Sequence, residues 1–216
     1  MKKIYILLLI FITSLSVNAQ DKVVLKQTFI KVKPGNNYAE DLKTKFGEMA
    51  QKRIDAGYQE AWHLWEVVDN PQAPFTHLIV EPVLISQMEK EWTRESWLEM
   101  RNEAVPGMTD SDWQAFMESV RNKRDIVAEA MFVTVTDVRR DNDTSLPSDV
   151  GVVNWMKVKE GKFKTYENME KALYSNGLNK NDLRVGWSLA KRIDKYGVDL
   201  YWNCLLYTSP SPRDTI

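Results

Sequence analysis

The stretch Phe29-Ile30-Lys31-Val32-Lys33-Pro34-Gly35 decides the fold, because it returns further along the chain as Trp155-Met156-Lys157-Val158-Lys159-Glu160-Gly161. In each copy apolar side chains alternate with lysines, which is the period-two pattern of a strand with one buried face. Each copy ends at a glycine that predicts a turn, and a helical pattern follows at a similar distance. The sequence therefore predicts that one strand–turn–helix unit occurs twice.

The likeness between the two copies continues past the turn. The first helix has an apolar face that starts at Tyr38, and the second has one formed by Tyr166, Met169 and Leu173. The strand at residues 61–69 is echoed by residues 186–194, and the strand at residues 75–83 by residues 198–203. Because the order and the spacing agree, we interpret the pattern as an internal duplication.

Further elements complete the first unit. A capping box at residues 86–89 opens a helix predicted over residues 86–103. Thr109 and Asp112 cap another helix, whose apolar stripe runs from Trp113 to Val127, and a strand follows at residues 131–136. The order β-α-β-β-α-β with an extra helix is that of a ferredoxin-like domain.

These elements predict an α+β chain of two tandem ferredoxin-like units. The first unit covers residues 20–140 and carries the extra helix, and residues 141–149 form a linker rich in Asp, Asn, Ser and Pro. The second unit covers residues 150–203 and is incomplete, because its pattern stops where a second helix is expected.

Two ferredoxin-like units in one chain resemble the dimeric α/β-barrel superfamily, in which two four-stranded sheets pack face to face and line a barrel with side chains from both. The resemblance covers about residues 22–203 and rests on element order and repetition. It implies that the two units form an α/β-barrel-like pair. The superfamily includes haem-degrading and cofactor-independent monooxygenases, dye-decolourising peroxidases, stress-responsive barrels and members with no known activity, so the resemblance does not select a function.

The N-terminus has the pattern of a secretory signal peptide. Lys2 and Lys3 precede an apolar run at residues 4–12, and small or compact residues end at Ala19. The run is shorter than the roughly 20 residues that a membrane-spanning helix needs. We therefore expect residues 1–19 to be cleaved after Ala19 and the mature protein to be periplasmic or secreted.

The C-terminal residues depart from the patterned chain. Residues 204–214, which begin at Cys204, resemble the in-frame translation of a transposase-type sequencing adapter. On this interpretation residues 204–216 are a sequencing artefact, and the native chain continues past Asn203 with a different sequence.

The composition argues against several function classes. The 216 residues include 29 Lys or Arg and 30 Asp or Glu, a balance that gives no electrostatic footprint for nucleic acid or an acidic membrane. One cysteine forms no internal disulfide, and two histidines do not fill a tetrahedral zinc site without carboxylates. We predict no cofactor, no nucleic-acid partner and no membrane association after cleavage, and we leave a homo-oligomer open.

The two histidines and one carboxylate are the candidate catalytic residues. His63 and His77 lie on two predicted strands that flank the turn at residues 70–74. In one pairing register they share a sheet face with Glu81, where they could bind a metal, ligate haem or act as a base. A slip of one residue separates the histidines, and the simpler interpretation is that both are half-exposed strand residues bonded to their neighbours.

Aromatic residues supply the candidate ligand pocket, because an aromatic-lined cavity with few polar groups suits an apolar ligand. The candidates are Trp65, Trp155, Trp202 and Tyr201. The sequence thus predicts an exported small-molecule-binding or interaction protein. The alternative is a monooxygenase-like or haem-handling α/β-barrel enzyme that uses His63 or His77, with Glu81 or Tyr201 nearby.

Overall fold

The computed structural model describes residues 22–68, 72–139, 150–175, 184–194 and 200–207. The first unit contains, in order, β1 (Val23–Val32), α2 (Tyr38–Asp41), the π-helical turn η1 (Leu42–Phe46), α3 (Gly47–Asp55), β2 (His63–Glu66), β3 (His77–Leu84), α4 (Ile85–Met88), α5 (Arg94–Ala104), α6 (Asp110–Lys123) and β4 (Arg124–Arg139). The second contains β5 (Val150–Lys157), α7 (Phe163–Ser175), β6 (Arg184–Arg192) and β7 (Leu200–Tyr207). The predicted signal peptide (1–19), the predicted linker (141–149) and residues 208–216 lie outside the described residues.

All seven strands belong to one antiparallel sheet with the order β2-β3-β1-β4-β6-β7-β5. Within the first unit β1 lies between β3 and β4, as expected when both crossovers of a split βαβ unit place their helices on one face. In the second unit β7 lies between β6 and β5. The predicted fold class, a tandem pair of ferredoxin-like units, is confirmed.

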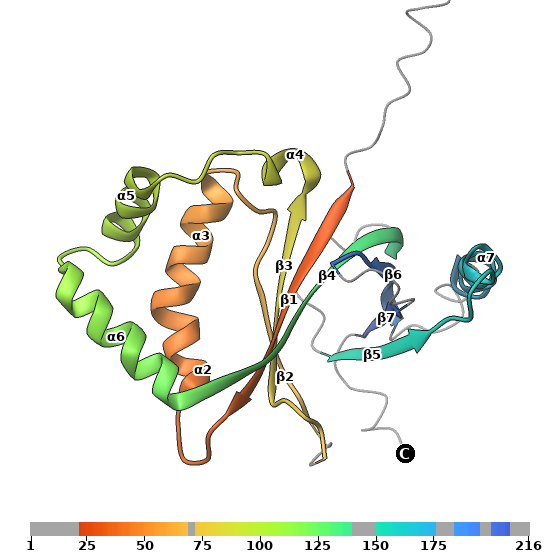
Figure 1. Cartoon of the computed structure of the whole chain (residues 1–216), viewed down its shortest axis with the longest axis horizontal. Helices are drawn as coiled ribbons and strands as arrows, with labels where there is room; N and C mark the ends of the chain where they lie inside the picture. Colours follow the sequence, from red (N-terminus) through yellow and green to blue (C-terminus); the bar gives the residue numbers. More distant parts are fainter. Residues whose placement is uncertain (1–21, 69–71, 140–149, 176–183, 195–199, 208–216) are drawn as a thin grey trace, which may run out of the picture.

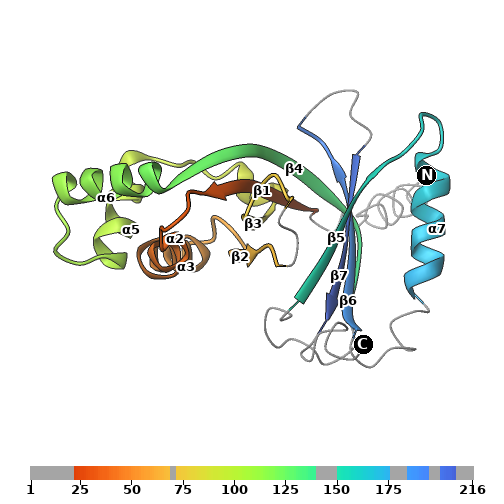
Figure 2. The ribbon, with the colours of Figure 1, turned by 90° about the horizontal axis from the view of Figure 1, so that it is seen from below.

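Strand β4 joins the two units, because it pairs with β1 on one side and with β6 on the other. Figure 2 shows it running from the first half of the molecule into the second. The strand is longer than predicted. It starts at Arg124, so Val127 belongs to the strand and not to the apolar stripe of the preceding helix.

The helix predicted over residues 86–103 is two helices, α4 and α5. The second begins after Thr93, whose hydroxyl accepts a hydrogen bond from the Ser96 backbone N–H at 3.1 Å and so caps the new helix. The extra helix of the first unit is therefore present, but it is preceded by a separate turn of helix.

Helices cover the outer faces of the sheet and leave the inner faces of the two halves turned toward each other (Figure 1). The outer core of the first unit includes Ile30 of β1, Tyr38 of α2, Leu42 of η1 and Val120 of α6. In the second unit α7 packs Tyr166 and Tyr174 over Trp187 and Leu189 of β6.

The buried face of α7 differs from the prediction. Tyr166 lies toward the sheet as expected, but Glu170 takes the next buried position, while Met169 and Leu173 are exposed. The helix is therefore turned by about one residue from the orientation that apolar spacing predicts, because Glu170 has a buried hydrogen-bond partner in Asn203.

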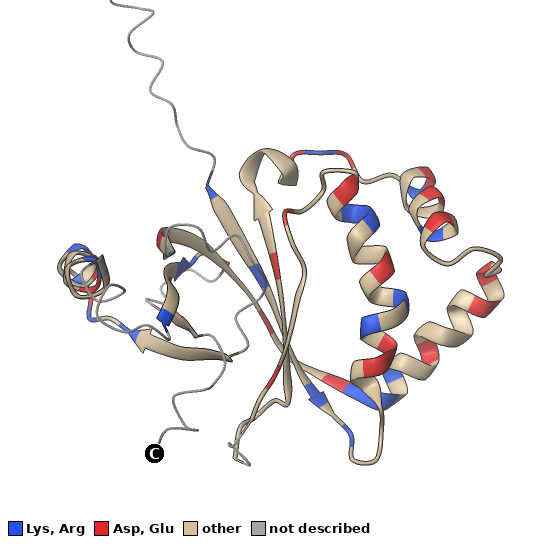
Figure 3. Ribbon diagram, turned by 180° about the vertical axis from the view of Figure 1, so that it is seen from behind, with Lys and Arg blue, Asp and Glu red and all other residues tan. Residues whose placement is uncertain are grey.

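Charged residues of both signs lie along α3, α5 and α6 (Figure 3). None of the helices in the described part of the chain is long and apolar enough to cross a membrane.

Candidate functional site

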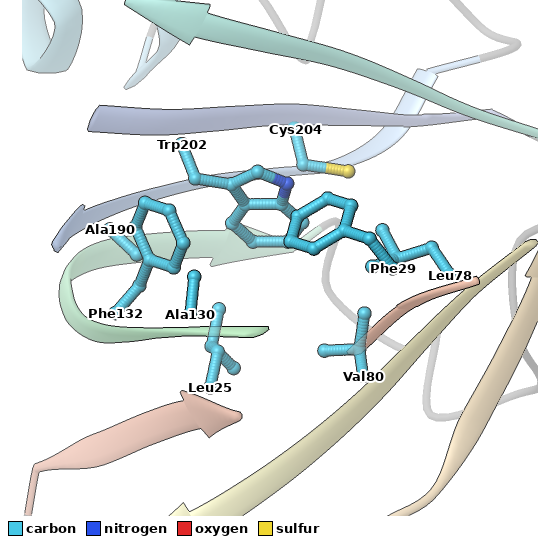
Figure 4. Close-up of a cluster of buried hydrophobic side chains, with 9 residues drawn as sticks. All are labelled: Leu25, Phe29, Leu78, Val80, Ala130, Phe132, Ala190, Trp202 and Cys204. Carbon is cyan, nitrogen blue, oxygen red and sulfur yellow. The ribbon is translucent and has the colours of Figure 1, made fainter. Parts of the chain in front are cut away.

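The two half-sheets meet in a cluster of buried apolar side chains (Figure 4), and we call the region that these side chains fill between the two half-sheets the chamber. Strands β1, β3 and β4 contribute from the first unit, and β6 and β7 from the second. The lining residues are Leu25, Phe29, Leu78, Val80, Ala130, Phe132, Ala190, Trp202 and Cys204. Because neither half contains all of these residues, the chamber exists only when both units pack together.

Aromatic rings extend the chamber toward the edge strand β5. The ring of Trp155 lies 5.9 Å from that of Phe29 and 6.0 Å from that of Phe75, measured between centroids. Phe29 and Phe75 are themselves in edge-to-face contact at 5.0 Å. Such contacts are favourable beyond the area that they bury.

The two edge strands also approach each other across the chamber. A Cβ atom added to Gly151 of β5 would lie 3.3 Å from a ring carbon of Trp65 on β2. Among the described residues, β2 pairs only with β3 and β5 only with β7. The contact between these two edges is therefore made by a side chain and not by a hydrogen-bonded ladder.

Three of the four predicted pocket residues lie on this inner face. Trp202 lines the chamber, Trp65 packs against it, and Trp155 is opposite Trp202 in the β5–β7 pairing. Tyr201 is not with them, because neighbours in a strand point to opposite faces. It is buried beneath α7, where its hydroxyl donates a hydrogen bond to Glu167 at 2.8 Å.

The chamber contains a polar group that the sequence analysis missed. Gln27 is only 1% exposed and pairs with Val80 on one side and Ala130 on the other, both of which line the chamber. Neither atom of its side-chain amide has a hydrogen-bond partner among the described residues, and the same holds for the indole N–H of Trp202. Leaving a buried polar group unpaired costs roughly 1–3 kcal/mol, so such groups point to a missing partner.

A signal for Gln27 was present in the sequence. It occupies the inner-face position between Leu25 and Phe29, where the alternation of β1 calls for an apolar residue. A polar side chain at a core position is the exception that deserves a functional explanation.

The histidines do not meet. His63 pairs with Val80 and Glu66 pairs with His77, which is the register that separates the two imidazoles. His63 therefore lies on the chamber face and His77 on the outer face, so the shared site with Glu81 that the other register would give is wrong.

His77 is part of the outer packing. Its Nδ1 lies 3.0 Å from the Thr76 hydroxyl, and its ring meets that of Tyr38 edge-on at 6.3 Å. Burial lowers the pKa of His77 below its ordinary value, so the imidazole is neutral at pH 7.

Glu81 binds a residue of the helix layer on the outer face of the sheet. Its carboxylate accepts a hydrogen bond from Arg53 of α3 at 2.8 Å, which ties that helix to β3. No three His, Cys, Asp or Glu side chains gather into a possible metal site in the described part of the chain.

The segment predicted to be a sequencing artefact is partly inside the fold. Cys204, Leu205, Leu206 and Tyr207 form the second half of β7, and the Cys204 side chain is buried in the chamber. Residues 208–216 lie outside the part of the chain that the structure describes.

Comparison with known proteins identifies the fold. No family model matches the chain, and no curated protein is similar to it in sequence. The structure is similar to a candidate monooxygenase from Lactobacillus acidophilus, with a TM-score of 0.52 and 10% identity over 91% of this chain and 81% of the other. It is also similar to a candidate monooxygenase from Fusobacterium nucleatum, with a TM-score of 0.52 and 9% identity over 88% of this chain and 76% of the other.

Identities this low show a shared fold and nothing more. The chain shares with these two structures a fold built from ferredoxin-like α+β units.

Proposed function

We propose that this protein is exported and binds a small, mostly apolar molecule in the chamber between its two half-sheets. The observation that carries the proposal is the position of Trp155. Its ring packs on Phe29 and Phe75 at the chamber, yet 37% of the residue is exposed. An aromatic side chain that belongs to an apolar interior and also reaches solvent is suited to the mouth of a binding site.

The border between the edge strands β2 and β5 is the proposed entry route for such a molecule. Since Trp65 and Gly151 join the two edges through side-chain packing, this border can part without breaking a backbone hydrogen bond. The border is the natural route into the chamber, because other neighbouring strands in the sheet are held by ladders of hydrogen bonds.

The proposal is tested by measuring the binding of naphthalene and of 2-naphthol to the protein by calorimetry. We expect both probes to bind the wild type and the Trp155→Ala variant to bind them about tenfold more weakly, because the variant loses an aromatic wall. Trp92→Ala is the matched control, since Trp92 is exposed and packs on Tyr58, away from the chamber. Equal affinities in the wild type and Trp155→Ala would contradict the proposed site.

A second candidate is oxygenation of the bound molecule, because the two similar structures are named as candidate monooxygenases. The observation on this chain that favours it is that His63 lies on the chamber face. An imidazole there is placed to take a proton from a bound aromatic carbon acid. With anthrone, the balanced reaction consumes one O₂ and yields anthraquinone and water.

Oxygen uptake in the presence of anthrone tests this second candidate. If it holds, His63→Ala lowers kcat and leaves the Kd for anthrone unchanged, while His77→Ala, on the outer face, changes neither. If the wild-type protein consumes oxygen no faster than anthrone does without protein, this second candidate function is excluded. A haem-dependent version is tested separately by titrating haem into the protein and recording whether a Soret band appears and whether either variant abolishes it.

A further inference from the structure

We infer that the molecule bound in the chamber carries a hydroxyl group, held between the side-chain amide of Gln27 and the indole N–H of Trp202. The inference rests on the proposed function, because it assumes that the chamber is occupied. It adds the chemical class of the ligand and the end of the molecule that enters first.

Gln27 and Trp202 come from different units but belong to one chamber. Gln27 lies between Leu25 and Phe29 on the inner face of β1. In Figure 4 the indole of Trp202, from β7, lies between the rings of Phe132 and Phe29 and above Ala130 of β4, the residue that pairs with Gln27. Both residues therefore lie on the inner faces that meet in the chamber, and their unpaired polar atoms are buried there.

The unpaired atoms differ in what they require. Gln27 Oε1 can only accept a hydrogen bond, whereas Gln27 Nε2 and Trp202 Nε1 can only donate one. An ether or ketone oxygen can accept a hydrogen bond but cannot donate one to Oε1. A hydrocarbon forms no hydrogen bond with any of the three unpaired atoms. A hydroxyl group can donate to Oε1 and accept from Nε1, whereas an ether or ketone oxygen can pair only with the N–H donors and leaves Oε1 without a partner.

The burial of the two ends gives the orientation. Gln27 is almost fully buried, whereas Trp155 is exposed and packs on Phe29, two residues from Gln27 along β1. Two residues of strand span about 7 Å. The hydroxyl end therefore lies in the interior, and the apolar body extends along the aromatic rings toward the border between β2 and β5.

Three probes of matched shape separate these requirements. Naphthalene has no polar group, 2-methoxynaphthalene can only accept a hydrogen bond, and 2-naphthol can donate and accept. For the wild type we expect 2-naphthol to bind about tenfold more tightly than 2-methoxynaphthalene, because only 2-naphthol pairs with Gln27 Oε1.

Two variants assign the preference to its residues. Gln27→Met keeps the length of the side chain and removes both polar atoms, so the preference for 2-naphthol should fall to within about twofold while naphthalene still binds. Trp202→Phe keeps a ring and removes the N–H, and it should weaken 2-naphthol more than naphthalene. Gln59→Leu is the control, since Gln59 is equally buried but bonds to the Ala50 carbonyl, outside the chamber.

The outcomes distinguish the two proposals. If all three probes bind the wild type with equal affinity, the hydroxyl inference is overturned and the proposed function stands. If Gln27→Met keeps the full preference for 2-naphthol over 2-methoxynaphthalene, or if Trp202→Phe keeps the full preference for 2-naphthol over naphthalene, the assignment to that pair is overturned. If no probe binds the wild type, the proposed function fails. The wild-type series needs no variant, so a variant that does not fold leaves the inference testable.

Discussion

The outer faces of the two units are packed differently. In the first unit Ile30 of β1 is 1% exposed and packs with Val120 of α6, whereas its repeat equivalent in β5, Met156, is 42% exposed. The residue four positions after the first buried tyrosine of the helix is Leu42 in one unit and Glu170 in the other. The strand and turn positions are thus kept between the copies, while the chemistry beneath the helices has diverged.

The divergence has a physical counterpart beneath α7. The indole N–H of Trp187 donates to Asn203 at 3.1 Å, and the Asn203 amide donates to the Glu170 carboxylate at 2.8 Å. A buried carboxylate is acceptable when it receives such hydrogen bonds. The outer core of the second unit therefore contains a buried hydrogen-bonded network, whereas the cluster around Ile30 in the first unit consists of apolar and aromatic side chains.

The largest difference between the two units in the free energy of unfolding is expected for substitutions at the equivalent strand positions Ile30 and Met156. Ile30→Ala should lower the free energy of unfolding by about 3 kcal/mol, because it leaves a cavity under α6. Met156→Ala should lower it by less than about 1 kcal/mol, because that side chain is exposed. Urea denaturation measures both, and equal losses would mean that the two outer faces are packed alike.

The second-largest loss in the free energy of unfolding is expected when the hydrogen-bonded network beneath α7 is broken. Asn203→Ala leaves the Trp187 N–H and the Glu170 carboxylate without their shared partner, and we expect a loss of about 2 kcal/mol in the free energy of unfolding. Asn154, which is opposite Asn203 on β5 and exposed, provides the control. Its replacement by Ala should change stability by no more than about 0.5 kcal/mol. A similar loss in both variants would show that the buried network is not the cause.

The smallest effect tests what the two units share. Gly35 and Gly161 end the two copies of the repeated strand with φ angles of +77° and +74°, and an added Cβ would meet nothing within 4 Å at either position. Substitution by Ala should cost about 1 kcal/mol at each, because only the left-handed backbone is penalised. Denaturation curves should give the same value for both variants within a few tenths of a kcal/mol. Unequal costs would argue that the turns are not equivalent.

Local patterns predicted the elements well where they were strong. The repeated strand, its glycine turn and the order of the elements in both units follow from alternation, capping residues and spacing. The errors occur at borders and at polar exceptions. Thr93 starts a new helix inside a predicted one, Arg124 already belongs to β4, and Glu170 replaces an apolar residue on the buried face of α7.

The sequence by itself determined that two similar α+β units exist and that Trp65, Trp155 and Trp202 are candidates for one aromatic wall. Only the tertiary structure decided which side chains meet. Alternation shows which residues of one strand share a face, but pairing between strands depends on the turn and on the partner, and a shift of one residue exchanges the faces. For that reason the sequence left the register of His63 and His77 undecided, and it did not reveal that Gln27 and Trp202, from different units, lie on inner faces that pack together.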